Sequence, residues 1–288
     1  MNVLTDPFQA PYMARALAEL VILGVLGGAV GVFVLVRRLA YVADALTHTV
    51  FPGVVIGFAA GAAEGVFWGA LAAGLLTAAL LTLLTRTPRI SEDAALTVIL
   101  TALFGLGVVL VSRQHSYHHD LTAFLFGQVL TVTDEEITQS VALAVVCLAT
   151  LAALGRHLTL RAFDPDGARA LGCRIGLLDL ALNSVIALVV VAAVRSVGTM
   201  LVIALLVVPA AVGRLLSHRI PVIAATGAGF GGLCAWVGLA ASNAASLRYG
   251  LPLAAGPAVV LLMVAGYGTL RAATALAGRR KTWKKVRT

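Results

Sequence analysis

Long apolar runs constrain this sequence more than any other feature. Stretches of about 20 mostly uncharged residues recur between residues 16 and 275, separated by short polar turns. A run of that length spans the hydrocarbon core of a bilayer as an α-helix, whereas strands of a membrane barrel alternate between apolar and polar residues. Only 12% of the 288 residues are charged, against about 25% in a soluble domain, and the mean hydropathy is +0.99. The sequence therefore predicts an all-α, polytopic transmembrane helix bundle.

We expect eight or nine membrane spans in a single domain that covers residues 1–288. The apolar runs are 16–36, 41–60, 65–84, 94–112, 136–155, 175–194, 198–216, 221–241 and 254–275. The segment 121–130 is too short to span and could instead be re-entrant. If one span is miscounted, the orientation of part of the chain reverses.

Basic residues are distributed unevenly over the two sides of the expected bundle. With nine spans, 17 of the 21 Lys and Arg residues fall on the side that holds Arg37 and Arg38. Cytoplasmic loops carry such an excess, so with nine spans we expect an N-terminus outside the cell and a C-terminus in the cytoplasm. Seven of these residues lie in the last 18 positions, and we interpret the tail 276–288 as a cytoplasmic contact for anionic lipid. The net charge of +8 therefore does not indicate binding to nucleic acid.

Asp44 and His48 place a carboxylate and an imidazole four residues apart inside the second apolar run. Residues at this spacing share a helix face, and an ionisable group within a bilayer segment is by default a functional-site hypothesis. Pro52 follows four residues later and predicts a break or kink, because it lacks an N–H group. We expect Asp44 and His48 to line a pathway for a cation. Two ligands are too few for a transition metal, but a two-fold homodimer with this helix at its axis would supply four.

Two further features are weaker indications of a pathway. The expected outer loop contains His115, His118, His119 and Asp120, which could capture a divalent cation or could simply be solvated. Pro209 predicts a second break or kink, in the seventh apolar run, which could line the pathway or be purely structural.

The loop between the fifth and sixth runs predicts a short helix outside the membrane. Asp164 is a good N-cap, Pro165 fits the first helical position, and Asp166 favours the positive end of the helix. Gly172 suits the position after a helix end, and Arg169 and Leu171 precede it. This element, about residues 164–172, could dock another protein or merely close a loop.

Other polar and small residues favour structural roles. Asp179 and Asn183 form a second pair at a spacing of four, and we expect hydrogen bonds to neighbouring helices rather than a lining of the inner exit. Glycines recur in the first run and in the eighth, where they allow helices to approach closely. The sequence has no GxxxxGK[ST], HExxH or GxSxG motif, so neither ATP hydrolysis on this chain nor a common hydrolase site is indicated.

Five segments together resemble the permease subunits of bacterial ABC-3 importers for manganese, zinc and iron. The segments cover the chain from about residue 16 to residue 275. They are R-R-L at 37–39 followed by D-A-L-T-H-T-V-F-P-G at 44–53, S-E-D-A-A at 91–95, D-L to L-F-G at 120–127, F-D-P to A-L-G at 163–172, and V-G-T-M-L-V to P-A-A at 197–211.

The resemblance implies a multi-pass transport subunit of the bacterial cell (inner) membrane rather than an enzyme. It implies a homodimer that works with a cytoplasmic ABC ATPase dimer, docked on residues 164–172, and with an extracellular metal-binding protein. The cargo it implies is a manganese, zinc or iron ion that passes Asp44 and His48. No permanently bound cofactor is implied. Thr47, Phe51 and Ala43 depart from the family pattern and leave the choice of metal open. A permease for a metal chelate and an ion-coupled secondary transporter remain the alternatives.

Overall fold

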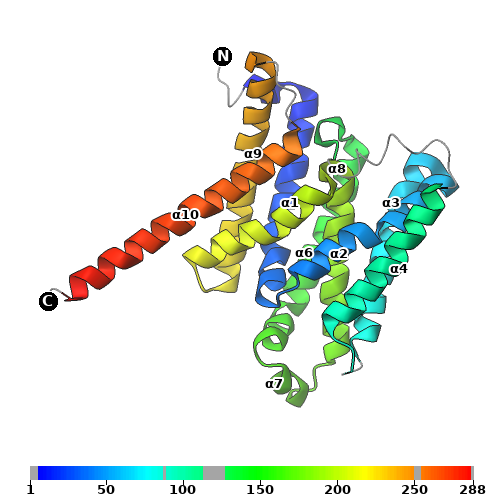
Figure 1. The fold of residues 1–288 in the computed structure, drawn as a ribbon, viewed down its shortest axis with the longest axis horizontal. Coiled ribbons are helices and arrows are strands. Elements are labelled where there is room, and N and C mark those ends of the chain that lie inside the picture. The colour runs from blue at the N-terminus through cyan, green and yellow to red at the C-terminus, as the bar shows by residue number, and fades with distance from the viewer. Residues whose placement is uncertain (1–5, 87–88, 113–126, 250–253, 287–288) are drawn as a thin grey trace.

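The computed structural model describes residues 6–86, 89–112, 127–249 and 254–286, and these form a bundle of helices without any strand (Figure 1). The predicted all-α transmembrane bundle is confirmed. The helices are α1 (Pro11–Val36), α2 (Ala40–Thr49), α3 (Phe51–Leu84), α4 (Glu92–Ser112), α6 (Asp134–Phe163), α7 (Pro165–Ala170), α8 (Ile175–Leu216), α9 (Ile220–Tyr249) and α10 (Ala255–Val286), with short 3-10 turns η1 (Asp6–Gln9) and η2 (Val129–Thr131).

Eight helical segments in the described part of the chain are long and apolar enough to cross a membrane. Helix α3 contributes to two of them, because α2 and its first part form one span, Ala40–Gly61, and the remainder forms the next, Glu64–Leu84. Glycines show that α3 folds back on itself. A Cβ atom at Gly57 would lie 2.2 Å from the carbonyl oxygen of Gly65, although a straight helix would separate these residues by about 12 Å.

Helix α8 is 42 residues long and contains a break at Gly198. The backbone there has φ 72° and ψ 166°, a conformation that glycine adopts readily and other residues avoid. Two halves of about 20 residues each, 175–197 and 199–216, diverge at this point (Figure 1). The eight continuous spans and the nine predicted runs therefore describe the same chain, with the sixth and seventh runs joined at the break.

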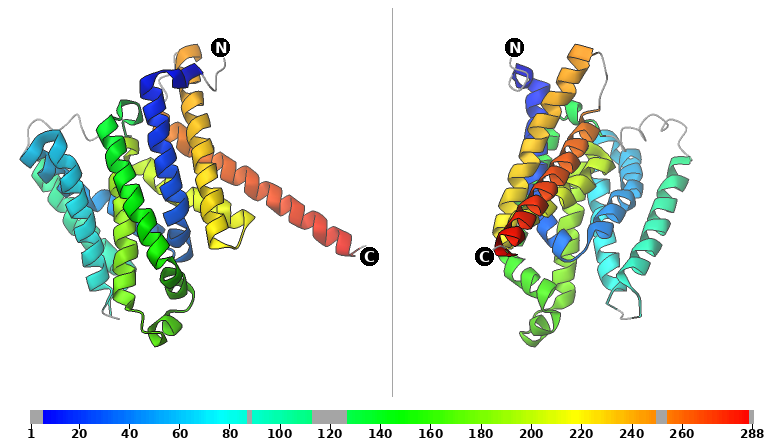
Figure 2. Two further views of the ribbon diagram at one scale, coloured as in Figure 1. Left: turned by 180° about the vertical axis from the view of Figure 1, so that it is seen from behind. Right: turned by 60° about the vertical axis from the view of Figure 1, so that its left-hand side comes forward.

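The connections fall on two sides of the bundle. The C-terminal ends of α1, α3 and α6 lie on the side of α7, whereas the start of α1, the bend in α3 and the junction between the two halves of α8 lie toward the other side (Figures 1 and 2). Successive spans therefore run in opposite directions, as the prediction of two sides with unequal numbers of basic residues requires.

Helix α1 is mostly buried and packs against α9, α8 and α6. Its glycines make this possible. A Cβ atom at Gly27 would lie 2.2 Å from the carbonyl oxygen of Leu205 in α8, and one at Gly28 would lie 2.4 Å from the backbone nitrogen of Ala228 in α9. Without side chains, the backbones approach closely, which is how membrane helices gain packing when no hydrophobic effect holds them together.

Candidate metal pathway

Asp44 and His48 lie next to each other on α2, as their spacing predicts. The Nε2 atom of His48 is 3.9 Å from the Oδ1 atom of Asp44. This separation is longer than a hydrogen bond but shorter than the sum of two metal–ligand bonds of about 2.1 Å. A single divalent cation can therefore contact both side chains at once.

The rest of α2 is almost entirely buried. Beyond Ala40 at its start, only Tyr41, Asp44 and His48 reach the surface of the chain, and they form one stripe. The side chains of Asp44 and His48 are 41% and 36% exposed, respectively. The other residues pack against α8, α4 and α3. This helix therefore presents its two candidate metal ligands at the surface of a single chain rather than inside it.

The surroundings of His48 fix where the imidazole lies. Its ring meets the ring of Phe104 from α4 edge to face, with centroids 5.8 Å apart. The same phenylalanine contacts Phe51, the residue at which α3 begins. Helix α2 ends at Thr49 and α3 begins at Phe51, with Pro52 in its first turn. Val50 between them keeps helical dihedral angles, with φ −70° and ψ −24°, so the interruption after His48 is confined to one residue and a kink there stays a prediction.

One chain does not complete a metal site in the part that the structure describes. No group of three or more His, Cys, Asp or Glu side chains there is arranged to hold an ion. The predicted outer-loop contacts His115, His118, His119 and Asp120 lie outside the described residues. Asp44 and His48 remain the candidate pair.

Helix α7 has the capped geometry that the sequence predicts. The carboxylate of Asp164 accepts a hydrogen bond of 2.8 Å from the backbone N–H of Gly167, and Pro165 begins the helix. Gly172 follows the helix with φ 77°. Asp166 forms an ion pair with Arg169. The side chains of Phe163 and Leu171 are 63% and 74% exposed, so this end of the molecule carries bare apolar surface beside charged groups.

Pro209 lies inside α8 without ending it, so the structure has no break in the helix there, and a kink at Pro209 stays a prediction. Helix α8 continues through Pro209, and its only non-helical residue is Gly198. Proline removes the usual hydrogen-bond partner of the Leu205 carbonyl, but that oxygen packs against the bare backbone of Gly27.

Asp179 and Asn183 have the structural roles that their pattern favours. Asp179 accepts hydrogen bonds from Arg37 at the end of α1 and, at 3.2 Å, from Arg161 near the end of α6. Asn183 donates to the hydroxyl of Thr82 at 3.2 Å. These contacts join four helices near the α7 side.

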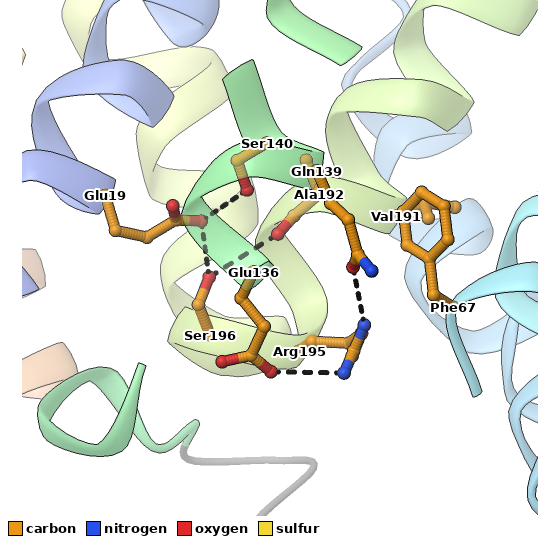
Figure 3. Close-up of a pocket in the computed structure, with 9 residues that line it drawn as sticks. All are labelled: Glu19, Phe67, Glu136, Gln139, Ser140, Val191, Ala192, Arg195 and Ser196. Carbon is orange, nitrogen blue, oxygen red and sulfur yellow. Dashed lines mark hydrogen bonds and ion pairs between the residues drawn. The ribbon is translucent and has the colours of Figure 1, made fainter. Parts of the chain in front are cut away.

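A second polar cluster surrounds Glu19, which is fully buried in α1 (Figure 3). Its carboxyl Oε1 atom accepts hydrogen bonds from Ser140 of α6 at 2.7 Å and from Ser196 of α8 at 3.1 Å. Beside it, Arg195 binds Glu136 and Gln139 and closes a small cavity. The cluster joins three helices two residues before the Gly198 break. The prediction from sequence overlooked it, although a lone carboxylate in the first apolar run was the available signal.

The chain resembles known membrane transport proteins along most of its length. Residues 9–268 match the ABC 3 transport family. The manganese transport system membrane protein MntC of Halalkalibacterium halodurans is 35% identical over 79% of this chain and 77% of its own length. The manganese import system permease protein ScaB of Streptococcus parasanguinis is 32% identical over 88% of this chain and 87% of its own.

A solved structure gives the same result for the fold. PsaBC from Streptococcus pneumoniae, in complex with a Fab, contains a chain that superposes with a TM-score of 0.78 at 28% identity. The superposition covers 92% of this chain and 93% of the other. The helix arrangement of the present structure therefore matches that of a solved relative.

Proposed function

This chain belongs to the ABC 3 transport family, and on that premise we propose that it is the membrane permease subunit of an ATP-driven importer of a divalent transition metal. Manganese is the first candidate cargo, because MntC and ScaB are named as manganese transport proteins. Zinc and iron remain cargoes for the experiment to test.

The observation that carries this proposal is the surface stripe on α2. A carboxylate and an imidazole 3.9 Å apart face outward from a helix that is otherwise buried. Manganese and zinc both accept oxygen and nitrogen ligands, and a site in transit must bind weakly enough to release its ion. Two protein ligands, completed by water or by a second copy, meet that requirement better than a closed site does.

A homodimer completes the proposed pathway. A two-fold axis beside the stripe brings Asp44 and His48 of one chain opposite the same residues of the other. Four ligands then surround the ion, which for zinc implies bonds of about 2.0–2.2 Å. The exposure of the pair in a single chain supports this arrangement, because a lone chain would otherwise present a costly carboxylate to lipid.

The positions of the other subunits are inferred from the family and from the two sides of the bundle. We assign the α7 side to the cytoplasm, where a dimer of ABC ATPases docks on residues 164–172, and the N-terminal side to the exterior, where a metal-binding protein delivers the cargo. The whole chain acts as one permease domain, and its basic tail (276–288) meets anionic lipid. The excess of arginines in the turns on the α7 side supports this orientation.

The test is uptake by the reconstituted transporter. The chain, its ATPase and its binding protein are placed in liposomes, and ATP-dependent accumulation of manganese, zinc and iron is measured. The proposal predicts accumulation of at least one free ion, only when ATP and the ATPase are present. Uptake without the ATPase would indicate a secondary transporter, and uptake of chelated metal alone would indicate a chelate permease. Either result would overturn the proposal.

A further inference from the structure

A groove of about 700 Å³ lies on the outside of the bundle, on the face turned away from α2. Helices α6, α1 and α9 form this face in the left view of Figure 2. Helix α1 packs against both α6 and α9 and provides the floor through Ala29 and Phe33. The walls are α6 and the first turn of α9, which begins at Ile220.

The groove has the length of one lipid leaflet. Along α6 it runs from Leu148 to Thr159, which at 1.5 Å per residue is about 16 Å. The hydrocarbon core of a bilayer is about 30 Å thick, so each leaflet contributes about 15 Å. The groove therefore reaches from about the middle of the membrane to one of its surfaces.

The two ends of the groove differ in chemistry. Its deeper end is lined by aliphatic side chains, including those of Leu148, Leu151 and Ala152. Its other end, on the α7 side, carries two exposed arginines, Arg156 of α6 and Arg219 in the turn before α9. Neither guanidinium forms an ion pair with a carboxylate in the described part of the chain. Two arginine side chains without a carboxylate partner therefore lie where the apolar groove reaches the membrane surface.

We propose that this groove binds an anionic phospholipid from the leaflet on the α7 side. The phosphate lies between Arg156 and Arg219, which can each donate two parallel hydrogen bonds to it, and one acyl chain lies along the aliphatic wall of α6. Basic pockets between membrane helices recognise anionic headgroups in this way. The bound lipid joins α6 to α9, which meet mainly through α1.

Other occupants fit the groove less well. A free phosphate ion would satisfy the arginines but leave the apolar wall unfilled. A second copy of the chain, related by a two-fold axis through the groove, would bring two further arginines to the same place, where like charges repel. A zwitterionic phospholipid would fill the apolar wall but would bring a positive group close to the two cations.

Native mass spectrometry of the delipidated, full-length chain tests the proposal. The dissociation constants of phosphatidylglycerol and phosphatidylcholine are measured for the wild type and for the double variant Arg156→Gln/Arg219→Gln. We expect the wild type to prefer phosphatidylglycerol and the variant to bind it about 25-fold more weakly, at roughly fivefold per arginine. The matched control is Arg86→Gln/Arg89→Gln, which removes two exposed arginines on the same side but outside the groove. Its affinity should equal that of the wild type.

A second variant tests the apolar part of the groove without touching its charges. A Cβ atom at Gly155 meets no atom within 4 Å, so Gly155→Leu fills the groove without a backbone clash, and leucine favours the helix more than glycine does. We expect this variant to lose phosphatidylglycerol binding as well. Equal binding of both lipids by the wild type, equal losses in the arginine variant and its control, or unchanged binding by Gly155→Leu would each overturn the proposal. If Gly155→Leu leaves binding unchanged and glycerol phosphate binds as tightly as phosphatidylglycerol, the groove is a site for free phosphate rather than for a lipid.

Discussion

At the scale of single residues, the molecule separates two kinds of acidic group. Asp44 is half exposed and lies 3.9 Å from an imidazole, so its charge is open to an incoming cation. Glu19 is fully buried and accepts two hydroxyl hydrogen bonds, so its carboxyl group is committed to the protein. The first arrangement suits binding and release, and the second suits the joining of helices.

Glu19 offers a test of that structural role. Glu19→Ala removes the acceptor for Ser140 and Ser196 and leaves a small cavity, which should cost about 2–4 kcal/mol of stability. Glu19→Gln keeps an oxygen acceptor of the same length and should cost much less. Thermal unfolding of the purified protein in detergent measures both. Equal melting temperatures for Glu19→Ala and the wild type would show that the cluster does not stabilise the bundle.

The sequence predicts residue roles well where they depend on local spacing. Asp44 and His48 meet because residues four apart share a helix face, and Asp164 caps α7 because its neighbours are typical of a helix start. It does not predict contacts between distant parts of the chain, such as the approach of the Gly27 backbone to Leu205 or the hydrogen bonds from Ser140 and Ser196 to Glu19. Such long-range contacts are invisible to a local pattern.

At the scale of helices, close approach between α1 and its neighbours organises the bundle. Gly28→Ala should push α1 away from α9, because the new Cβ atom would lie 2.4 Å from a backbone nitrogen. Overpacking of this kind should cost about 1–3 kcal/mol. Gly229→Ala is the matched control on α9, since a Cβ atom there meets nothing within 4 Å. The melting temperature should fall for the first variant and stay level or rise for the second. A similar fall in both would point to a general effect of losing glycine.

The exposure of the α2 stripe could not be predicted from the sequence. Its ten residues are mostly small or apolar, and their order does not show which face packs against α8 and α4. Only the assembled bundle leaves Asp44 and His48 at the surface. The nine apolar runs, by contrast, were predictable because the thickness of a bilayer fixes the length of each run.

At the scale of the whole molecule, the α7 end is the proposed contact for the ATPase. Leu171→Ser removes an apolar side chain that is 74% exposed, so the fold should tolerate it while docking weakens. We expect co-purification of the ATPase to fall by about tenfold, as expected for an apolar interface anchor worth about 1–2 kcal/mol. Leu130→Ser, an exposed leucine in η2 toward the opposite side, is the control and should leave the complex intact. Full co-purification with Leu171→Ser would remove α7 from the docking surface.

The proposed dimer links the residue scale to the whole molecule. A single chain offers two candidate metal ligands in its described part, and in the proposed dimer a second copy would supply two more. The proposal therefore couples metal binding to assembly, because the ion would meet four ligands only where the two α2 helices face each other.

The most direct test of this account is ATP-driven manganese uptake by reconstituted transporters that carry Asp44→Asn or His48→Gln. Both variants should assemble with the ATPase normally, because the two side chains are exposed in the chain, and both should lose more than about tenfold in uptake. Asp93→Asn and His218→Gln, which alter an exposed acid and an exposed histidine elsewhere, should transport like the wild type. Wild-type uptake by either Asp44→Asn or His48→Gln would contradict the account.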